Sequence, residues 1–210
     1  MKSAIFDMDG TVLDSMREWD NLSANHLRSL GVEPPDDLTD IIKEMSLDDS
    51  LKYLMGRFKL WKTKEEFLVQ MREQIHIMYR DRVKLKPYAV EYLQKLKRDG
   101  IPFGIATATP KKYAEEALTR LGVYDMFDFV ICEDDVGADK HSPDIYFEAA
   151  RRLGTEPAET AVFEDAPYAA RTAKKAGFIV YVIEDKSFVN RKDELLKLAD
   201  TYITGFRELL

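Results

Sequence analysis

The stretch AIFDMDGTVLDS, residues 4–15, passes from a short apolar run directly into three acidic residues, Asp7, Asp9 and Asp14. The apolar run is typical of a strand buried in a sheet. Two carboxylates placed two residues apart at the end of such a strand repel each other, so they need a compensating positive charge. The stretch therefore predicts both the first strand of the fold and the place of a functional site.

The rest of the chain repeats this pattern of a short strand followed by a helix. Further β-branched and aromatic runs, each followed by residues at helical spacing, occur at 102–107, 127–132, 160–164 and 178–183. Such alternation is typical of a parallel sheet covered by helices on both faces. We therefore predict an α/β fold with a Rossmann-like parallel sheet. If the first strand is central with the second and fourth beside it, the polar residues at the strand ends converge on one pocket.

Two of the predicted helices show recognisable start signals. Thr109-Pro110 and Ser142-Pro143 each match an N-cap residue followed by proline at the first helical position. We expect both hydroxyls to serve the helix ends.

Residues 14–83 interrupt the alternation of strands and helices. Their apolar residues recur at helical spacing in four segments, 19–31, 36–45, 48–58 and 64–79. We predict an inserted α-helical cap domain over 14–83, with the core domain formed by 1–13 and 84–210. The stretch KLKPYA, residues 84–89, is the expected return hinge.

Composition narrows the range of functions. The 210 residues are 45% hydrophobic and carry a net charge of −7, with Lys and Arg spread along the chain, so we expect no nucleic-acid or membrane partner. The single cysteine, Cys132, excludes a disulfide framework. Without a signal-peptide pattern or an apolar run that could cross a bilayer, the expected location is the cytoplasm. An acidic chain without an obvious apolar stripe favours a monomer.

Polar side chains follow the predicted strands at the edge where ligands bind in open parallel sheets. They are Asp7, Asp9, Thr107, Lys140, Glu164 and Asp165. The four carboxylates of this set are crowded and need a cation between them. Because they offer only oxygen ligands, they indicate Mg²⁺, which commonly shares its coordination shell with a phosphate. A lysine, a hydroxyl and the main-chain amide of Ala108 would supply positive charge and hydrogen bonds to a phosphoryl group.

These motifs make the chain recognisable. DMDGTVLDS with Thr107, then KHSPDIY (140–146) and VFEDAPYAARTAKKAG (162–177), resembles the four motifs of the haloacid dehalogenase-like superfamily, in the beta-phosphoglucomutase-like branch with a helical (C1-type) cap. The motifs occur in order and with the right spacing over essentially the whole chain. The third motif departs from the usual glycine, lysine, proline, since it reads Asp139-Lys140-His141. The fourth has alanine at 166 and 169, where serine and glycine are common.

The resemblance implies a role for each site residue. Asp7 is the nucleophile that forms an aspartyl-phosphate, and Asp9 is the general acid and then the general base. Thr107 binds the transferring phosphoryl group, and Lys140 pairs with Asp7. Asp165 is a metal ligand.

The implied Mg²⁺ site also includes Asp7, the main-chain carbonyl of Asp9, and Glu164, which binds directly or through water. Gly10 permits the turn that lets the two aspartates act on one substrate. In the insertion, Arg17 is a candidate substrate contact. Asp14 is interpreted as structural.

We therefore predict a magnesium-dependent phosphatase that acts on a small phosphorylated metabolite, such as a sugar phosphate or a similar monoester. Asp9 argues against a dehalogenase, because a halide leaving group needs no proton. A beta-phosphoglucomutase-like sugar phosphomutase is the alternative, but such mutases typically carry a histidine and an arginine where this chain has Trp19 and Leu47. A remote alternative is a non-catalytic phospho-receiver module, which also combines aspartates, a threonine and a lysine.

Overall fold

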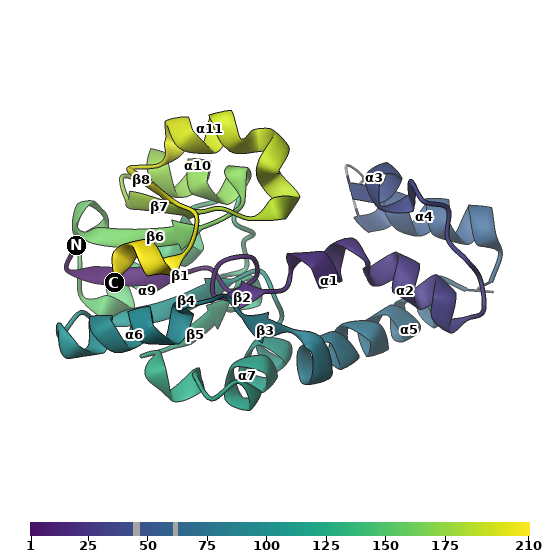
Figure 1. Ribbon diagram of the computed structural model, residues 1–210, viewed down its shortest axis with the longest axis horizontal. Coiled ribbons are helices and arrows are strands. Elements are labelled where there is room, and N and C mark those ends of the chain that lie inside the picture. Colours follow the sequence, from purple (N-terminus) through teal and green to yellow (C-terminus); the bar gives the residue numbers. More distant parts are fainter. Residues whose placement is uncertain (44–46, 61–62) are drawn as a thin grey trace. The chain divides into compact units, whose positions relative to one another are not determined.

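The computed structural model describes residues 1–43, 47–60 and 63–210 and divides the chain into two compact units. The core unit comprises Met1–Met16 and Val83–Leu210, and the helical unit comprises Arg17–Arg82 (Figure 1). The predicted limits of the inserted domain, 14 and 83, lie close to this division. Its role as a cap stays a prediction.

A six-stranded sheet forms the centre of the core unit, and all neighbouring strands in it are parallel. In spatial order the strands are β5 (Val130–Cys132), β4 (Phe103–Thr107), β1 (Ser3–Phe6), β6 (Thr160–Glu164), β7 (Ile179–Ile183) and β8 (Thr201–Ile203). The predicted α/β fold is confirmed, and the condition that the first strand lies between the second and the fourth is met. The edge strand β8 is absent from the prediction because three residues are too short a run to show a period.

Alternate residues of the strands face opposite sides of the sheet. Ile5 and Val162 belong to an aliphatic cluster with Ile145 on one side. On the other side, Phe6 stacks on Phe163 with ring centroids 4.4 Å apart. Both faces of β1 are thus buried, which explains why its sequence is an unbroken apolar run.

Helices connect the strands of the core unit. They are α6 (Ala89–Arg98), α7 (Lys111–Arg120), α8 (Glu133–Val136), α9 (Asp144–Leu153), α10 (Pro167–Lys175) and α11 (Lys192–Leu198), with short 3₁₀ turns η2 (Tyr124–Met126), η3 (Pro157–Glu159), η4 (Lys186–Arg191) and η5 (Phe206–Leu209).

The two predicted helix starts are wrong by one residue. Helices α7 and α9 begin one residue later than expected, so Pro110 and Pro143 occupy the N-cap positions. Because the cap positions are taken by prolines, the hydroxyls of Thr109 and Ser142 bond other groups. Ser142 donates to Asp144, and the partner of Thr109 is described below.

A second, two-stranded sheet lies where the chain leaves and re-enters the core unit. Strands β2 (Leu13–Asp14) and β3 (Lys84–Leu85) pair antiparallel, with Leu13 opposite Leu85. This pairing brings together the two chain segments that flank the helical unit.

The helical unit has its own apolar core, in which Leu27, Leu54 and Phe67 are buried. Its elements are α1 (Met16–Asp20, which begins in the core unit), α2 (Leu22–Ser29), α3 (Leu38–Lys43), α4 (Leu47–Phe58), α5 (Lys64–Ile77) and the π-helical turn η1 (Met78–Arg82). The predicted helical character of this segment is confirmed for its described part. Leu47 begins α4, but its side chain lies outside what the structure describes.

Candidate active site

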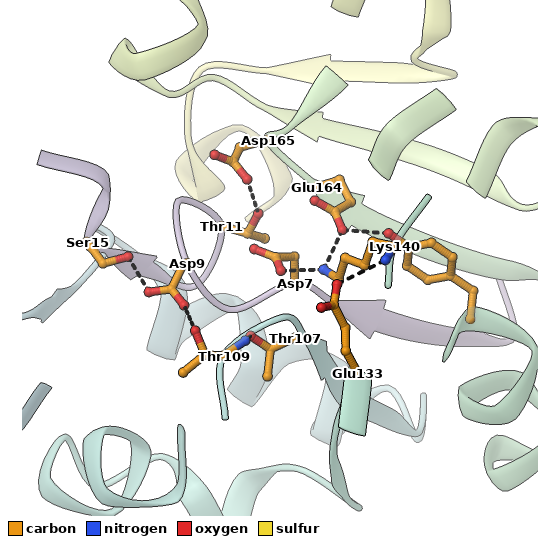
Figure 2. A network of polar contacts seen from close by, with 11 residues as sticks. Asp7, Asp9, Thr11, Ser15, Thr107, Thr109, Glu133, Lys140, Glu164 and Asp165 are labelled. Atoms are coloured by element: carbon orange, nitrogen blue, oxygen red, sulfur yellow. Dashed lines mark hydrogen bonds and ion pairs between the residues drawn. The ribbon is translucent and has the colours of Figure 1, made fainter. Parts of the chain in front are cut away.

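The candidate site lies at the carboxyl ends of three central strands (Figure 2). Asp7 directly follows β1, Thr107 ends β4, and Glu164 ends β6. Lys140 reaches the same place from the loop between α8 and α9. All four side chains are buried. The charges of Asp7, Glu164 and Lys140 therefore act on each other with little screening by water.

Lys140 is the centre of the polar network. It is 1% exposed, and its Nζ donates to Asp7 Oδ1 and, at 2.7 Å, to Glu164 Oε1. Tyr146 donates its hydroxyl to the same Glu164 oxygen at 2.7 Å. The main-chain N–H of Lys140 donates to Glu133 Oε1 at 2.9 Å. Lys140 is therefore held both at its main chain and at its ammonium group.

Three carboxylates form a group that could hold a metal ion. Asp7, Glu164 and Asp165 each offer an oxygen atom, and these atoms lie within 4.8 Å of one another. Asp165 is 2% exposed, and its Oδ2 has no hydrogen-bond partner among the described residues. A buried carboxylate oxygen without a partner is costly, and a hard cation with oxygen ligands such as Mg²⁺ would satisfy it. The residues present thus fit a Mg²⁺ ion.

The ionisation of this group shows the same surplus of negative charge. Burial raises the pKa of Asp7 to about 8, although Lys140 opposes the rise. Burial and the charges of Asp7 and Glu164 raise the pKa of Asp165 well above its usual range. Burial disfavours the charged form of Lys140, but Asp7 and Glu164 outweigh it and raise the Lys140 pKa. One ammonium cannot balance three carboxylates, so either protons or a cation must do so.

Gly10 leaves the space that Asp165 occupies. Its φ is +81°, and a Cβ at this position would lie 2.1 Å from Asp165 Oδ2. Any side chain would therefore both strain the backbone and displace the unpartnered oxygen of Asp165.

We expect Gly10→Ala to abolish the rise in melting temperature that Mg²⁺ produces in the wild type. Gly122→Ala is the matched control, because Gly122 also has a positive φ, +72°, but no atom within 4 Å of the added Cβ. That variant should lose only about 1–2 kcal/mol from backbone strain and keep the Mg²⁺ response. Thermal unfolding with and without Mg²⁺ measures both, and an unchanged response in Gly10→Ala would contradict the proposed metal site.

Asp9 points away from the carboxylate group and contacts two hydroxyls. Its Oδ1 accepts a hydrogen bond from Ser15 at 2.6 Å, and its Oδ2 accepts one from Thr109 at 2.7 Å (Figure 2). The N–H of Thr109 also donates to Thr107 Oγ1 at 3.0 Å. Thr109 is a site residue that the sequence pattern assigns to a helix cap; the signal that could have found it is its position two residues after Thr107.

The remaining predicted contacts are placed as follows. Ala108 is exposed beside Thr107, and Gly10 is buried against Asp165. Arg17 is exposed in the helical unit, so its contact with substrate stays a prediction.

The helical unit contains a cavity of about 600 Å³. Its wall is mostly apolar and includes Trp19, Leu54, Phe67 and Met71. Trp19 donates its indole N–H to the Tyr79 hydroxyl at 3.2 Å, which fixes the ring. Trp19 thus contributes a largely apolar ring to the wall of this cavity.

Within the described ranges, no helix is both long enough and apolar enough to span a bilayer.

Known proteins match this chain over most of its length. A family model for haloacid dehalogenase-like hydrolases matches residues 1–177. The chain is 30% identical over 204 residues to the validoxylamine A 7'-phosphate phosphatase of Streptomyces hygroscopicus subsp. limoneus, covering 93% of each chain. It is also 30% identical to the phosphorylated carbohydrates phosphatase of Thermotoga maritima, over 84% of this chain and 82% of that one. A proposed beta-phosphoglucomutase of Thermotoga maritima has a crystal structure with a TM-score of 0.87, at 28% identity, covering 97% and 94% of the two chains.

Proposed function

The chain belongs to the haloacid dehalogenase-like hydrolases, and on that premise we propose that it is a magnesium-dependent phosphatase of small phosphorylated metabolites. The observation that carries this proposal is the placement of Asp7. Its carboxylate is buried, held by Lys140, and close to the carboxylate of Asp165, whose Oδ2 has no hydrogen-bond partner in the part of the chain that the structure describes. A carboxylate so placed can attack a phosphorus atom whose charge is balanced on the spot.

The first half of the reaction would use both aspartates after β1. An oxygen of Asp7 forms a bond to phosphorus while the bond from phosphorus to the substrate oxygen breaks. Asp9 gives a proton to that leaving oxygen, so the alcohol departs neutral. The phosphoryl group is then attached to Asp7 as an acyl phosphate.

The second half would return Asp7 to its free form. Asp9, now a carboxylate, takes a proton from a water molecule that attacks the same phosphorus. The bond between phosphorus and Asp7 breaks, and inorganic phosphate is released. Lys140 and the hydroxyl of Thr107 stabilise the phosphoryl oxygens in both halves.

Asp7, Asp165 and the main-chain carbonyl of Asp9 would hold the Mg²⁺ ion, with Glu164 bound directly or through water. When bound, the ion supplies positive charge to the phosphoryl oxygens and keeps Asp7 ionised at neutral pH. Glu164 also accepts hydrogen bonds from Lys140 and Tyr146, which fixes its orientation. Among the residues that the structure describes, Asp165 Oδ2 has no such partner, so Asp165 is the ligand most dependent on the ion.

We place the chain among phosphatases of sugar phosphates or similar monoesters, because both curated relatives described above are phosphatases, one of them of phosphorylated carbohydrates. The inserted helical unit would act as a cap that excludes bulk water during transfer. We propose a cytoplasmic monomer whose partner is its small substrate. The hydrolase family and the inserted helices favour an enzyme over a receiver module.

A sugar phosphomutase is the second candidate, since the solved structure with a TM-score of 0.87 is a proposed beta-phosphoglucomutase. A mutase must hold the second phosphate of a bisphosphate intermediate. Trp19 cannot do so, because its ring is apolar and its N–H is bonded to Tyr79. Water is therefore the favoured acceptor.

We expect phosphate release from beta-glucose 1-phosphate, or from a better substrate found in a metabolite screen, to account for all the substrate consumed. The screen is run with Mg²⁺ and with a chelator, and glucose 6-phosphate is measured in the same samples. Formation of glucose 6-phosphate without matching phosphate release would show that the chain is a mutase.

A further inference from the structure

The loop that carries Lys140 lacks the proline that, in the resembled motif, restricts the backbone directly after the lysine. The resembled motif has glycine before the lysine and proline after it, whereas this chain has Asp139 and His141. Nevertheless the ammonium of Lys140 lies within hydrogen-bond distance of both Asp7 and Glu164. Because a shift of about 1 Å in a reacting group can cost on the order of a hundredfold in rate, something else must fix this loop.

A pair of stacked rings provides the missing restraint. The rings of His141 and Tyr168 are stacked, with centroids 4.8 Å apart and planes 28° from parallel. His141 directly follows Lys140, and Tyr168 lies in the first turn of α10, three residues after Asp165. The stack therefore ties the residue next to the lysine to the helix that begins next to the metal ligand.

Main-chain contacts fix the same loop on both sides of the lysine. The N–H of Lys140 donates to Glu133 in the first turn of α8, and the N–H of His141 donates to Asp139 Oδ1 at 2.9 Å. On the other side, Thr172 of α10 donates to the carbonyl of His141 at 3.4 Å. The stacked rings and the Thr172 contact both link this loop to α10.

The stack lies outside the apolar core of the unit. Both rings line a surface cavity of about 460 Å³, together with Phe147 and Lys175. His141 is exposed, and Tyr168 is partly buried. Truncating either ring should therefore change the loop without unfolding the sheet.

From this geometry we infer that His141 and Tyr168 are positioning residues, whose stacked rings hold Lys140 between Asp7 and Glu164. The inference rests on the proposed function for its effect on rate, but not for its effect on the position of Lys140. Neither ring is assigned a contact with the substrate. They act through the lysine, in place of the proline that the motif usually has.

The test compares ring removal with ring replacement. Tyr168→Ala and His141→Ala should each lower kcat for p-nitrophenyl phosphate, with Mg²⁺ present, by about 10- to 100-fold, while KM stays within about threefold. Tyr168→Phe and His141→Phe keep a ring and should retain kcat. The double alanine variant should be no slower than the slower single variant, because both changes break one contact.

A second measurement reports Lys140 without any substrate. A buried, ion-paired ammonium exchanges its protons slowly, so its side-chain ¹H–¹⁵N signal should be visible in NMR spectra and is assigned by its loss in Lys140→Met. We expect this signal to persist in the phenylalanine variants and to broaden or vanish in the alanine variants. Lys175→Ala is the matched control, because Lys175 lines the same cavity and should change neither kcat nor the signal.

The two proposals fail in different ways. Wild-type protein that releases no phosphate from any compound in the screen would overturn the proposed function, while the Lys140 signal would still decide the role of the rings. Wild-type kcat and an intact Lys140 signal in Tyr168→Ala would overturn the positioning role. Equal loss of kcat in Tyr168→Phe and Tyr168→Ala would also overturn it, because the ring would then not be what matters.

Discussion

Replacement of Asp7 by asparagine is expected to reduce phosphate release by at least about a thousandfold while the protein stays folded. The amide has nearly the shape of the carboxylate but is a very weak nucleophile, so the first bond to phosphorus cannot form. Folding should not suffer, because the substitution removes one of three crowded carboxylates from a buried site and leaves Lys140 paired with Glu164. Phosphate release and thermal unfolding of the same preparations measure the two effects.

Asp14→Asn is the control for this experiment. Asp14 belongs to the same sequence motif but is exposed in β2, and its carboxylate should be dispensable for the chemistry. Acid-quenched wild-type protein should also carry a phosphoryl group on the peptide that contains Asp7. If Asp7→Asn retained a rate within about tenfold of the wild type, the aspartyl-phosphate mechanism would be wrong.

Lys140→Met should damage both stability and activity. In the absence of Mg²⁺ it leaves the carboxylates of Asp7 and Glu164 buried without their cation, which should cost about 3–5 kcal/mol of unfolding free energy. Mg²⁺ should restore part of this stability, because a divalent cation can compensate the same carboxylates. Activity should fall by about a thousandfold even with Mg²⁺, since the phosphoryl oxygens lose a charged partner.

Lys174→Met is the control that shows how much unfolding free energy is lost when a lysine in an exposed ion pair is replaced. Lys174 pairs with Asp200 at 2.6 Å, but both side chains are 40% exposed. Exposed ion pairs contribute about 0–1 kcal/mol, so this variant should unfold almost like the wild type. Urea titrations with and without Mg²⁺ measure both variants. A loss in Lys140→Met no larger than in Lys174→Met would mean that the buried pairs contribute little.

Much of the fold could be predicted because its signals are local. Each central strand is an apolar run followed by a helix, and this alternation is sufficient to predict a parallel α/β sheet. The order of the strands, with β1 between β4 and β6, does not follow from the alternation. The edge strand β8 is too short to show a period, and its pairing with β7 depends on distant contacts.

The charged residues of the site could be predicted for a related reason. Asp7 and Asp165 each follow a strand directly, so strand order determines where their side chains lie. The sequence signal for Lys140 is weaker, because this residue lies in a loop. Only its position after the third predicted strand indicates where it lies.

The supporting residues could not be predicted, because their partners are set by loop geometry. Tyr146 looks like an ordinary core residue of α9, yet its hydroxyl bonds Glu164. Thr109 matches a helix cap in the sequence. In the structure, Pro110 occupies the N-cap position of α7, and the Thr109 hydroxyl donates to Asp9 instead. His141 gives no signal of a ring partner in the sequence.

The short antiparallel pair of β2 and β3 has a consequence for how this protein can diversify. With Leu13 opposite Leu85, the chain leaves and re-enters the core unit at adjacent points. The helical unit, Arg17–Arg82, can therefore be exchanged, lengthened or shortened as a cassette, because a replacement segment needs only to rejoin two neighbouring chain segments. Substrate range could then evolve by recombination at this junction, while the candidate site residues after β1, β4 and β6 are inherited unchanged.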